Sequence, residues 1–234
     1  MTKIYEALDN ASRERTQSGP RRGGAGLAIT VSKPLEDKLL SLYQRIEAGM
    51  PGPRGPLVEV VGAHPGEEGA RVARQFAKLA AARMGKRVLL LGAVGPALAT
   101  EATSDWLEMA ANGELHEDAF RIVGESNLCV SQMASNTSTL ASVLAAPGLQ
   151  RVLEEVRQQF DMTVVVAPAL GASPEGYQLA SIVDGVVVVV EAGKTRWQAC
   201  KREIARMQAQ GAKVLGIILN KRRYYIPNFV YRRI

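Results

Sequence analysis

The sequence predicts an α/β fold: a doubly wound, mainly parallel sheet with helices on both faces. Strand-like and helix-like segments alternate along residues 57–219. Two of the strand-like segments, 162–167 and 185–190, are uninterrupted apolar runs, and a Gly/Pro-rich turn follows the first strand. Strands that are apolar along their whole length are typical of parallel sheets covered on both faces. We therefore expect a three-layer domain.

The chain is predicted to have four parts. Residues 1–15 form an N-terminal docking helix, 16–33 a flexible linker rich in Gly, Ser and Arg, 34–220 the α/β domain, and 221–234 a basic aromatic tail. The predicted strands are 57–63, 87–91, 128–133, 162–167, 185–190 and 214–219. The predicted helices are 34–48, 69–84, 105–111, 149–159, 174–181 and 195–209. Ser104 is expected to cap the third of these helices.

Composition and charge narrow the class of protein. With 234 residues, 47% of them hydrophobic, the chain can bury one full core. Cys129 and Cys200 lie far apart and are expected to stay reduced, which favours the cytosol. Residues 1–15 lack the apolar segment of a signal peptide, and no run approaches the roughly 20 residues of a membrane span. We expect a cytoplasmic protein.

The net charge of +6 is unevenly distributed. Residues 221–234 hold five cations and no acid. Such a tail attracts nucleic acid, anionic lipid or an acidic partner, and it can equally be a solvated basic end. We expect no nucleic-acid partner, because five basic residues suit an acidic protein partner as well.

The stretch from Val58 to Ala73 has the outline of a phosphate-binding loop. A working loop reads G-x-x-x-x-G-K-[ST], in which backbone N–H groups and the Lys hold phosphate and the hydroxyl holds Mg²⁺. Here Gly66 and Gly69 remain, but no Lys and no hydroxyl residue follow. Glu67 and Glu68 stand where phosphate would approach.

Two other strand ends are the places where the acidic residues of a phosphoryl-transfer site would lie. Ligands of such folds bind at the carboxyl ends of the strands. The strand 87–91 runs into Gly92-Ala93-Val94, and the strand 162–167 ends in Val166-Ala167. Metal-assisted phosphoryl transfer needs acids at these ends. We therefore expect no catalytic residue, no metal site and no required cofactor, although the loop leaves room for weak ATP or ADP binding.

These motifs show a resemblance to a known family. The chain resembles the bacterial tyrosine autokinases of exopolysaccharide and capsule export, which are deviant Walker P-loop ATPases with a Rossmann-like three-layer fold. The resemblance covers nearly the whole chain. It rests on the segments TKIYEALDNA, HPGEEGARVARQFA, KRVLLLGAV, QQFDMTVVVAPA, DGVVVVVEAGKTRW and VLGIILNKRRYYIPNFVYRRI.

The resemblance also implies which functional positions have changed. The loop's second Gly falls on Glu68 and its Lys on Gly69, and the ring-forming E-x-x-R motif keeps Glu36 but has Leu39 at the Arg. The lost catalytic positions are Gly69, Ala70, Arg71, Gly92, Val94 and Val166. A vestigial nucleotide site would consist of Gly66, Gly69, Arg71 and Asn220.

The resemblance implies a pseudokinase-like function. The leading hypothesis is a non-catalytic adaptor for an inner-membrane polysaccharide co-polymerase or chain-length protein, peripheral at that membrane through its partner. A second copy or an active paralogue is the alternative partner. The rival hypotheses are an unconventional tyrosine autokinase, with Arg71 or Arg74 replacing the Lys and Glu67 or Glu68 holding metal, and a nucleic-acid or membrane-surface binder. The predicted docking residues are Ile4, Tyr5, Leu8, Tyr224, Tyr225, Tyr231 and Arg232.

A few single residues carry minor expectations. The tail tyrosines are interpreted as docking groups, with phosphorylation as the alternative. Trp106 and Trp197 are expected to be packing residues rather than base-stacking platforms, and Asp161 to be a turn or cap residue. Glu191 is a candidate metal or ribose contact, against the simpler interpretation of a solvated strand end.

Overall fold

The computed structural model describes residues 33–50, 52–66, 68–94 and 105–221. The strands are β1 (Leu57–Gly62), β2 (Val88–Val94), β3 (Arg121–Ile122), β4 (Leu128–Ala134), β5 (Met162–Val166), β6 (Gly185–Glu191) and β7 (Val214–Asn220). The helices are α2 (Lys33–Gly49), α3 (Gly69–Arg83), α4 (Trp106–Asn112), α5 (Thr137–Ala145), α6 (Leu149–Gln159), α7 (Glu175–Ile182) and α8 (Trp197–Ala209), with the 3-10 turn η2 (Glu117–Ala119).

One seven-stranded sheet has the order β3-β4-β2-β5-β1-β6-β7. All neighbouring strands are parallel except β3 and β4. Strand β1 lies between β5 and β6 and is buried at every position. The predicted doubly wound, mainly parallel α/β fold is therefore confirmed.

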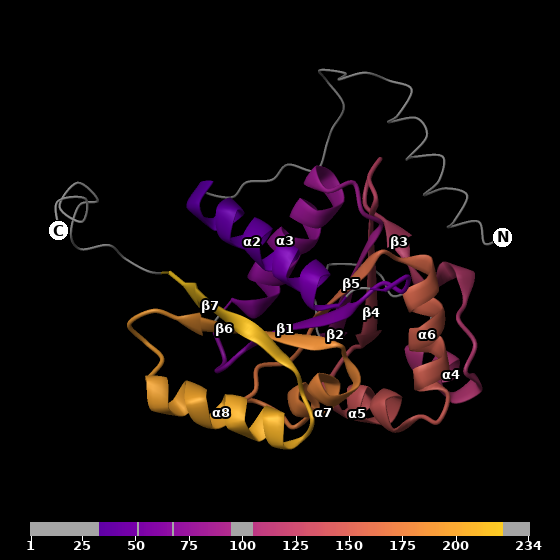
Figure 1. Cartoon of the computed structure of the whole chain (residues 1–234). Helices are drawn as coiled ribbons and strands as arrows, with labels where there is room; N and C mark the ends of the chain where they lie inside the picture. The colour runs from indigo at the N-terminus through magenta and orange to yellow at the C-terminus, as the bar shows by residue number, and fades with distance from the viewer. Residues whose placement is uncertain (1–32, 51, 67, 95–104, 222–234) are drawn as a thin grey trace, which may run out of the picture.

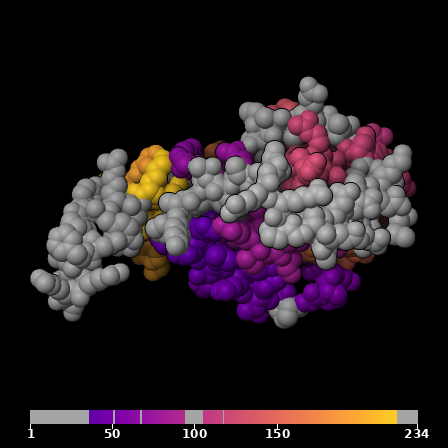
Figure 2. All heavy atoms as spheres, turned by 90° about the horizontal axis from the view of Figure 1, so that it is seen from above, coloured from indigo at the N-terminus to yellow at the C-terminus, as the bar shows by residue number. Residues whose placement is uncertain are grey.

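Helices cover both faces of this sheet. Helices α2 and α3 lie on one face, and α5, α7 and α8 lie on the other (Figure 1). Seen from above, α2 and α3 face the viewer and β7 lies at one margin in yellow (Figure 2). The buried side of α3 repeats every three or four residues, at Val72, Ala73, Phe76, Ala77 and Ala80. That spacing places one apolar stripe against the sheet.

Two helices begin at residues whose side chains cap the helix N-terminus. Helix α4 is capped by Asp105, whose carboxylate accepts a hydrogen bond from Leu107 N at 2.8 Å. The expectation of Ser104 as the cap was therefore wrong. Helix α5, which the sequence interpretation missed, is capped by Asn136 through Thr139 N at 2.8 Å. The segment SNTSTL looks like a loop because its Ser and Thr residues favour turns as well as caps.

The two tryptophans differ from each other. Trp106 is 1% exposed, and its Nε1 donates to Ser131 Oγ at 2.9 Å, so its predicted packing role is confirmed. Trp197 is 62% exposed, so the same expectation was wrong for it. Cys129 and Cys200 are both buried and unpaired with each other, and burial raises the pKa of the Cys129 thiol to about 12.

Glu59 is an unusual core residue. It is 0% exposed in the middle of β1, between Val165 of β5 and Val186 of β6. Neither carboxylate oxygen has a hydrogen-bond partner among the described residues. Burial raises its pKa well above the ordinary value. Burial without a hydrogen-bond partner therefore favours the uncharged form of this carboxyl.

Candidate functional site

The loop between β1 and α3 lies at the carboxyl edge of the sheet. It turns through two positive φ angles, +88° at Gly66 and 53° at Glu68. Left-handed backbone suits glycine and costs another residue about 1 kcal/mol. The strain at Glu68 agrees with a position that a phosphate-binding loop fills with glycine.

Gly69 packs directly against β1. A Cβ at this position would lie 2.9 Å from Gly62 N and 3.4 Å from Val61 C. Both neighbours are backbone atoms of the buried central strand, so they cannot move aside as a flexible side chain would. A lysine at Gly69 would therefore force α3 away from β1.

The Glu68 carboxylate lies among polar and cationic groups. Asn220 Nδ2 donates to Oε2 at 3.2 Å, and Arg71 Nη1 lies 3.4 Å from the same oxygen. Lys221 Nζ lies 3.4 Å from Oε1. Three groups that a phosphate could contact therefore surround a carboxylate supplied by the chain itself.

A second carboxylate extends this cluster. Glu191, at the end of β6, has Lys194 Nζ 3.4 Å from Oε2 and Lys221 Nζ 3.5 Å from Oε1. Lys221 thus bridges Glu68 and Glu191. We call these six residues the corner cluster: Glu68, Arg71, Glu191, Lys194, Asn220 and Lys221.

The electrostatics of the corner cluster favour charged Glu68. Burial acts to raise its pKa, but hydrogen bonds from Asn220 and Lys221 and the charges of Lys221 and Arg71 outweigh burial and lower the pKa. Glu68 is therefore ionised near pH 7. An incoming phosphate would meet this negative charge at short range.

The other two strand ends supply no acid. Gly92 of β2 lies beside Val166 of β5, which lies beside Val60 of β1. Val166 is 5% exposed and belongs to the apolar core. Within residues 33–50, 52–66, 68–94 and 105–221, no group of three or more His, Cys, Asp or Glu side chains could hold a metal.

The structure brings most of the predicted site residues together. Gly66 and Gly69 flank Glu68, which contacts Arg71 and Asn220. The sequence interpretation missed Lys221 as the link between Glu68 and Glu191, because the three residues are far apart in the chain. The predicted docking residues Ile4, Tyr5, Leu8, Tyr224, Tyr225, Tyr231 and Arg232 lie outside the described residues.

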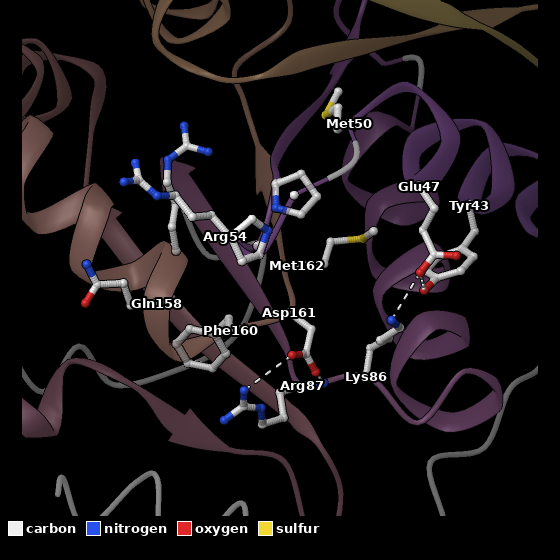
Figure 3. A pocket seen from close by; sticks show the side chains of 15 residues that line it. Tyr43, Glu47, Met50, Arg54, Lys86, Arg87, Gln158, Phe160, Asp161 and Met162 are labelled. Carbon is white, nitrogen blue, oxygen red and sulfur yellow. Dashed lines mark hydrogen bonds and ion pairs between the residues drawn. The ribbon is translucent and has the colours of Figure 1, made fainter.

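The opposite, amino edge of the sheet carries a hollow of about 330 Å³. Figure 3 shows Tyr43, Glu47 and Lys86 on one side of it, and Arg87 beside Asp161. Lys86 Nζ lies 3.1 Å from Glu47 Oε1. Burial and then the hydrogen bond to Glu47 raise the pKa of Tyr43 to about 12.

Two aspartates organise this amino edge. Asp161 accepts from Arg87 N at 2.7 Å, and Asp184 accepts from Leu57 N at 2.7 Å. The guanidinium groups of Arg87 and Arg157 pair with the same two carboxylates. Asp161 is thus a capping residue as expected, and the hollow's cations are already matched by acids.

The fold and the loop define a class before any relative is considered. A mainly parallel sheet with a glycine-bearing turn from the buried central strand into a helix is the architecture of P-loop NTPases. None of the described helices combines the length and the apolar character that a membrane span requires.

Comparison with known proteins narrows this class. No protein-family model matches the chain. It is 30% identical over 179 residues to the succinoglycan biosynthesis transport protein ExoP of Rhizobium meliloti, covering 73% of this chain and 23% of ExoP. It is 32% identical over 71 residues to the tyrosine-protein kinase CpsD of Streptococcus agalactiae, covering 30% of this chain and 31% of CpsD. The chain therefore spans less than a third of each of these two relatives.

A longer match covers almost the whole chain. Identity to the tyrosine-protein kinase YwqD of Bacillus subtilis is 24% over 216 residues, which is 89% of this chain and 91% of YwqD. The chain is thus a homologue of bacterial tyrosine kinases, and it is related to those of exopolysaccharide biosynthesis.

Solved structures agree on the fold. The kinase domain of Escherichia coli tyrosine kinase ETK aligns with a TM-score of 0.72 at 16% identity, covering 97% of this chain and 91% of ETK. The VpsO kinase domain gives 0.63 at 19% identity, with 82% and 100% covered. The cell division ATPase MinD of Pyrococcus furiosus gives 0.58 at 18% identity, with 76% and 78% covered. The P-loop ATPase fold predicted from the sequence is confirmed.

Proposed function

We propose that this chain is a catalytically silent homologue of the polysaccharide tyrosine kinases that acts by binding. One observation carries the proposal: Glu68 places an ionised carboxylate, held by Asn220, Arg71 and Lys221, where a P-loop holds phosphate. Gly69 has no room for the Lys that would counter a polyphosphate. The strand ends at Gly92 and Val166 supply no ligand for Mg²⁺.

Calorimetric titration tests the proposed absence of nucleotide binding. ATP and ADP, with and without Mg²⁺, are expected to give no heat beyond dilution when titrated into the full chain, and Mg²⁺-ATP should not raise its melting temperature. Hydrolysis or autophosphorylation well above a blank would overturn the proposal. A rise in melting temperature that Arg71→Ala abolishes would instead support an unconventional kinase with Arg71 in place of the lysine.

A matched variant asks whether Glu68 itself blocks the site. Glu68→Gly removes the carboxylate and leaves Arg71, Asn220 and Lys221 in place. We expect it to gain weak ATP binding without hydrolysis, because the phosphate-facing cations are freed. The double variant Glu68→Gly/Arg71→Ala serves as the control and should lose that gain.

The binding role proposed is that of a cytoplasmic adaptor for an inner-membrane polysaccharide co-polymerase or chain-length protein. The support is the relation to exopolysaccharide kinases together with a site that disfavours nucleotide. A bacterial two-hybrid assay with the cytoplasmic segments of such a protein should give a signal. Deleting residues 1–15 or 222–234 should lower it, and an unchanged signal in both deletions would contradict the docking role of these segments.

A further inference from the structure

The two outer strands of the sheet differ in how their edges are protected. Strand β3 has two residues and exposes Arg121. Strand β7 has seven residues, VLGIILN, and among the described residues it pairs with β6 alone. Long apolar edge strands are templates for another strand, and proteins usually shorten or charge them. Only the β3 edge follows that rule.

The backbone of β7 offers hydrogen-bonding groups at its free edge. Asn220 O accepts from Ala192 N, so Asn220 faces β6. The register is continuous from Gly216 to Asn220, and alternate residues direct their backbone groups to opposite sides. The N–H and C=O groups of Ile217 and Leu219 therefore point away from β6.

Large apolar side chains are exposed on β7 and at the start of α8, which packs against β7. The large hydrophobic residues exposed within the described residues are Trp197 (62%), Ile217 (42%) and Leu219 (45%). Ile217 and Leu219 lie beside Val188 and Val190 of β6 and share their face, the face that α8 covers. Strand β6 ends at Glu191, which lies beside Asn220 of β7, and Trp197 is the first residue of α8, which follows β6 in the chain. We call these three residues, together with the free edge of β7, the edge patch.

The segment between β6 and β7, which includes α8, is strongly basic. Residues 194–213 contain six exposed cations and a single acid, Glu203. Glu203 is 5% exposed and is already engaged by Tyr177, Arg202 and Arg206. Glu191, just outside this segment, offsets Lys194. The six cations are Lys194, Arg196, Lys201, Arg202, Arg206 and Lys213. Arg202 and Arg206 pair with Glu203, and Arg206 also lies over the Tyr177 ring of α7. We therefore call only the other four cations the basic rim: Lys194, Arg196, Lys201 and Lys213.

We propose that the edge patch binds an extended acidic peptide segment of a partner protein, which joins the sheet as a strand beside β7. Such a segment satisfies the free backbone of β7, covers Ile217 and Leu219 with alternate apolar side chains, and pairs its acids with the basic rim. The inference does not depend on whether nucleotide binds.

Charge and backbone chemistry select this occupant over others. A second copy would bring a second basic rim against the first, and residues 222–234 add arginines without an acid. An anionic bilayer would suit Trp197 and the basic rim. It would leave the N–H of Ile217 and Leu219 without a strand partner. The peptide alone matches all three features.

The probe is a synthetic peptide of alternating Val and Glu, and the control peptide alternates Val and Lys. Full-length protein is titrated while tryptophan emission is followed, because Trp197 lies in the edge patch and Trp106 is buried. The Val–Glu peptide should bind with an affinity that falls as salt rises. It should shift the emission to the blue, a shift that Trp197→Phe removes, and the Val–Lys peptide should not bind.

A pair of variants isolates the backbone contact. Ile217→Ala and Ile217→Pro both remove the side chain, but only the second removes the outward N–H, and an edge position tolerates proline. Ile217→Pro should weaken binding about tenfold relative to Ile217→Ala, as expected for one lost hydrogen bond. A backbone N-methylated Val–Glu peptide should show the same loss with the unaltered chain, which keeps the test valid if the Pro variant does not fold.

Several outcomes would overturn the proposal. The first is equal binding by the Ala and Pro variants together with no loss on N-methylation, and the second is equal binding of the two peptides. The third is binding of phosphatidylglycerol vesicles but not of the peptide. The fourth is self-association of the chain that Leu219→Ser disrupts, while the peptide does not bind.

Discussion

The two ends of the sheet use carboxylates in opposite ways. At the amino end, Asp161 and Asp184 each accept a strand N–H at 2.7 Å and pair with an arginine. At the carboxyl end, where the resemblance implies catalytic acids, the strands carry Gly92 and Val166. The acid that is present there, Glu68, pairs with the chain's own cations.

This difference separates structural from catalytic requirements. The amino-end acids satisfy backbone groups of the central strands, so the fold depends on them. Metal-binding acids at the carboxyl end serve a ligand, and a chain that no longer binds the ligand can lose them without cost to folding. The contrast supports the proposed silent site on an intact fold, and four substitutions test it.

The largest effect is expected at the amino end. Asp184→Ala removes the acceptor of Leu57 N and leaves Arg157, whose side chain is 16% exposed, without this partner. We expect a loss of about 3 kcal/mol in the free energy of unfolding, measured by urea denaturation. The control is Arg54→Ala, which breaks an exposed pair with Glu154 and should cost less than about 1 kcal/mol. Similar losses of stability in the two variants would contradict the expectation that the fold depends on the Asp184 contacts at the amino end.

The next effect is expected at the carboxyl end. Gly69→Lys restores the loop lysine, but its Cβ would lie 2.9 Å from Gly62 N. Overpacking of this kind costs about 2 kcal/mol, and we expect that loss without any gain in ATP affinity. Arg71→Lys, at a side chain 65% exposed, is the control and should change little. Tight Mg²⁺-ATP binding by Gly69→Lys would show that the site is only one substitution from function.

Glu59 lies between the two ends and should give a pH-dependent effect. Burial raises its pKa, so its contribution to stability is complete below the unfolded-state value near 4.5 and is lost as pH rises towards the folded-state pKa. Glu59→Leu should therefore stabilise the chain by about 1–2 kcal/mol at pH 8 and by less at pH 4. Glu59→Gln should also remove the pH dependence, but with a smaller gain. An unchanged pH profile in both variants would mean that Glu59 does not titrate in this range.

The smallest effect is expected for Glu68→Gly. Glycine relieves the left-handed strain, while the lost ion pairs are partly exposed, so the net change should stay within about 1 kcal/mol. The lowered pKa of Glu68 predicts the opposite sign of pH dependence from Glu59: its stabilisation is present above the unfolded-state value and is lost as pH falls. Urea denaturation at pH 4 and pH 7 measures the difference. A large loss at pH 7 would make Glu68 a structural residue comparable with Asp184.

The layered α/β fold of this protein could be predicted from its sequence. Alternating periodicity and uninterrupted apolar runs such as 185–190 predict a parallel sheet, because only strands buried on both faces are apolar throughout. The sequence also showed that the loop lysine and the strand-end acids are absent. The two-residue strand β3 and helix α5 escaped prediction, since a strand of that length has no periodicity and α5 begins in residues that also suit turns.

The contacts of Glu68 and the exposed edge of β7 could not be predicted, because they depend on how distant segments pack together. Glu68, Glu191 and Lys221 meet because β1, β6 and β7 end at the same edge of the sheet, and the packing of Gly69 on Gly62 appears only once α3 lies against β1. The exposure of Trp197 and of the β7 edge likewise depends on which strand lies outermost. Local patterns specify elements, whereas contacts between distant segments follow from the strand order, which no short window of sequence contains.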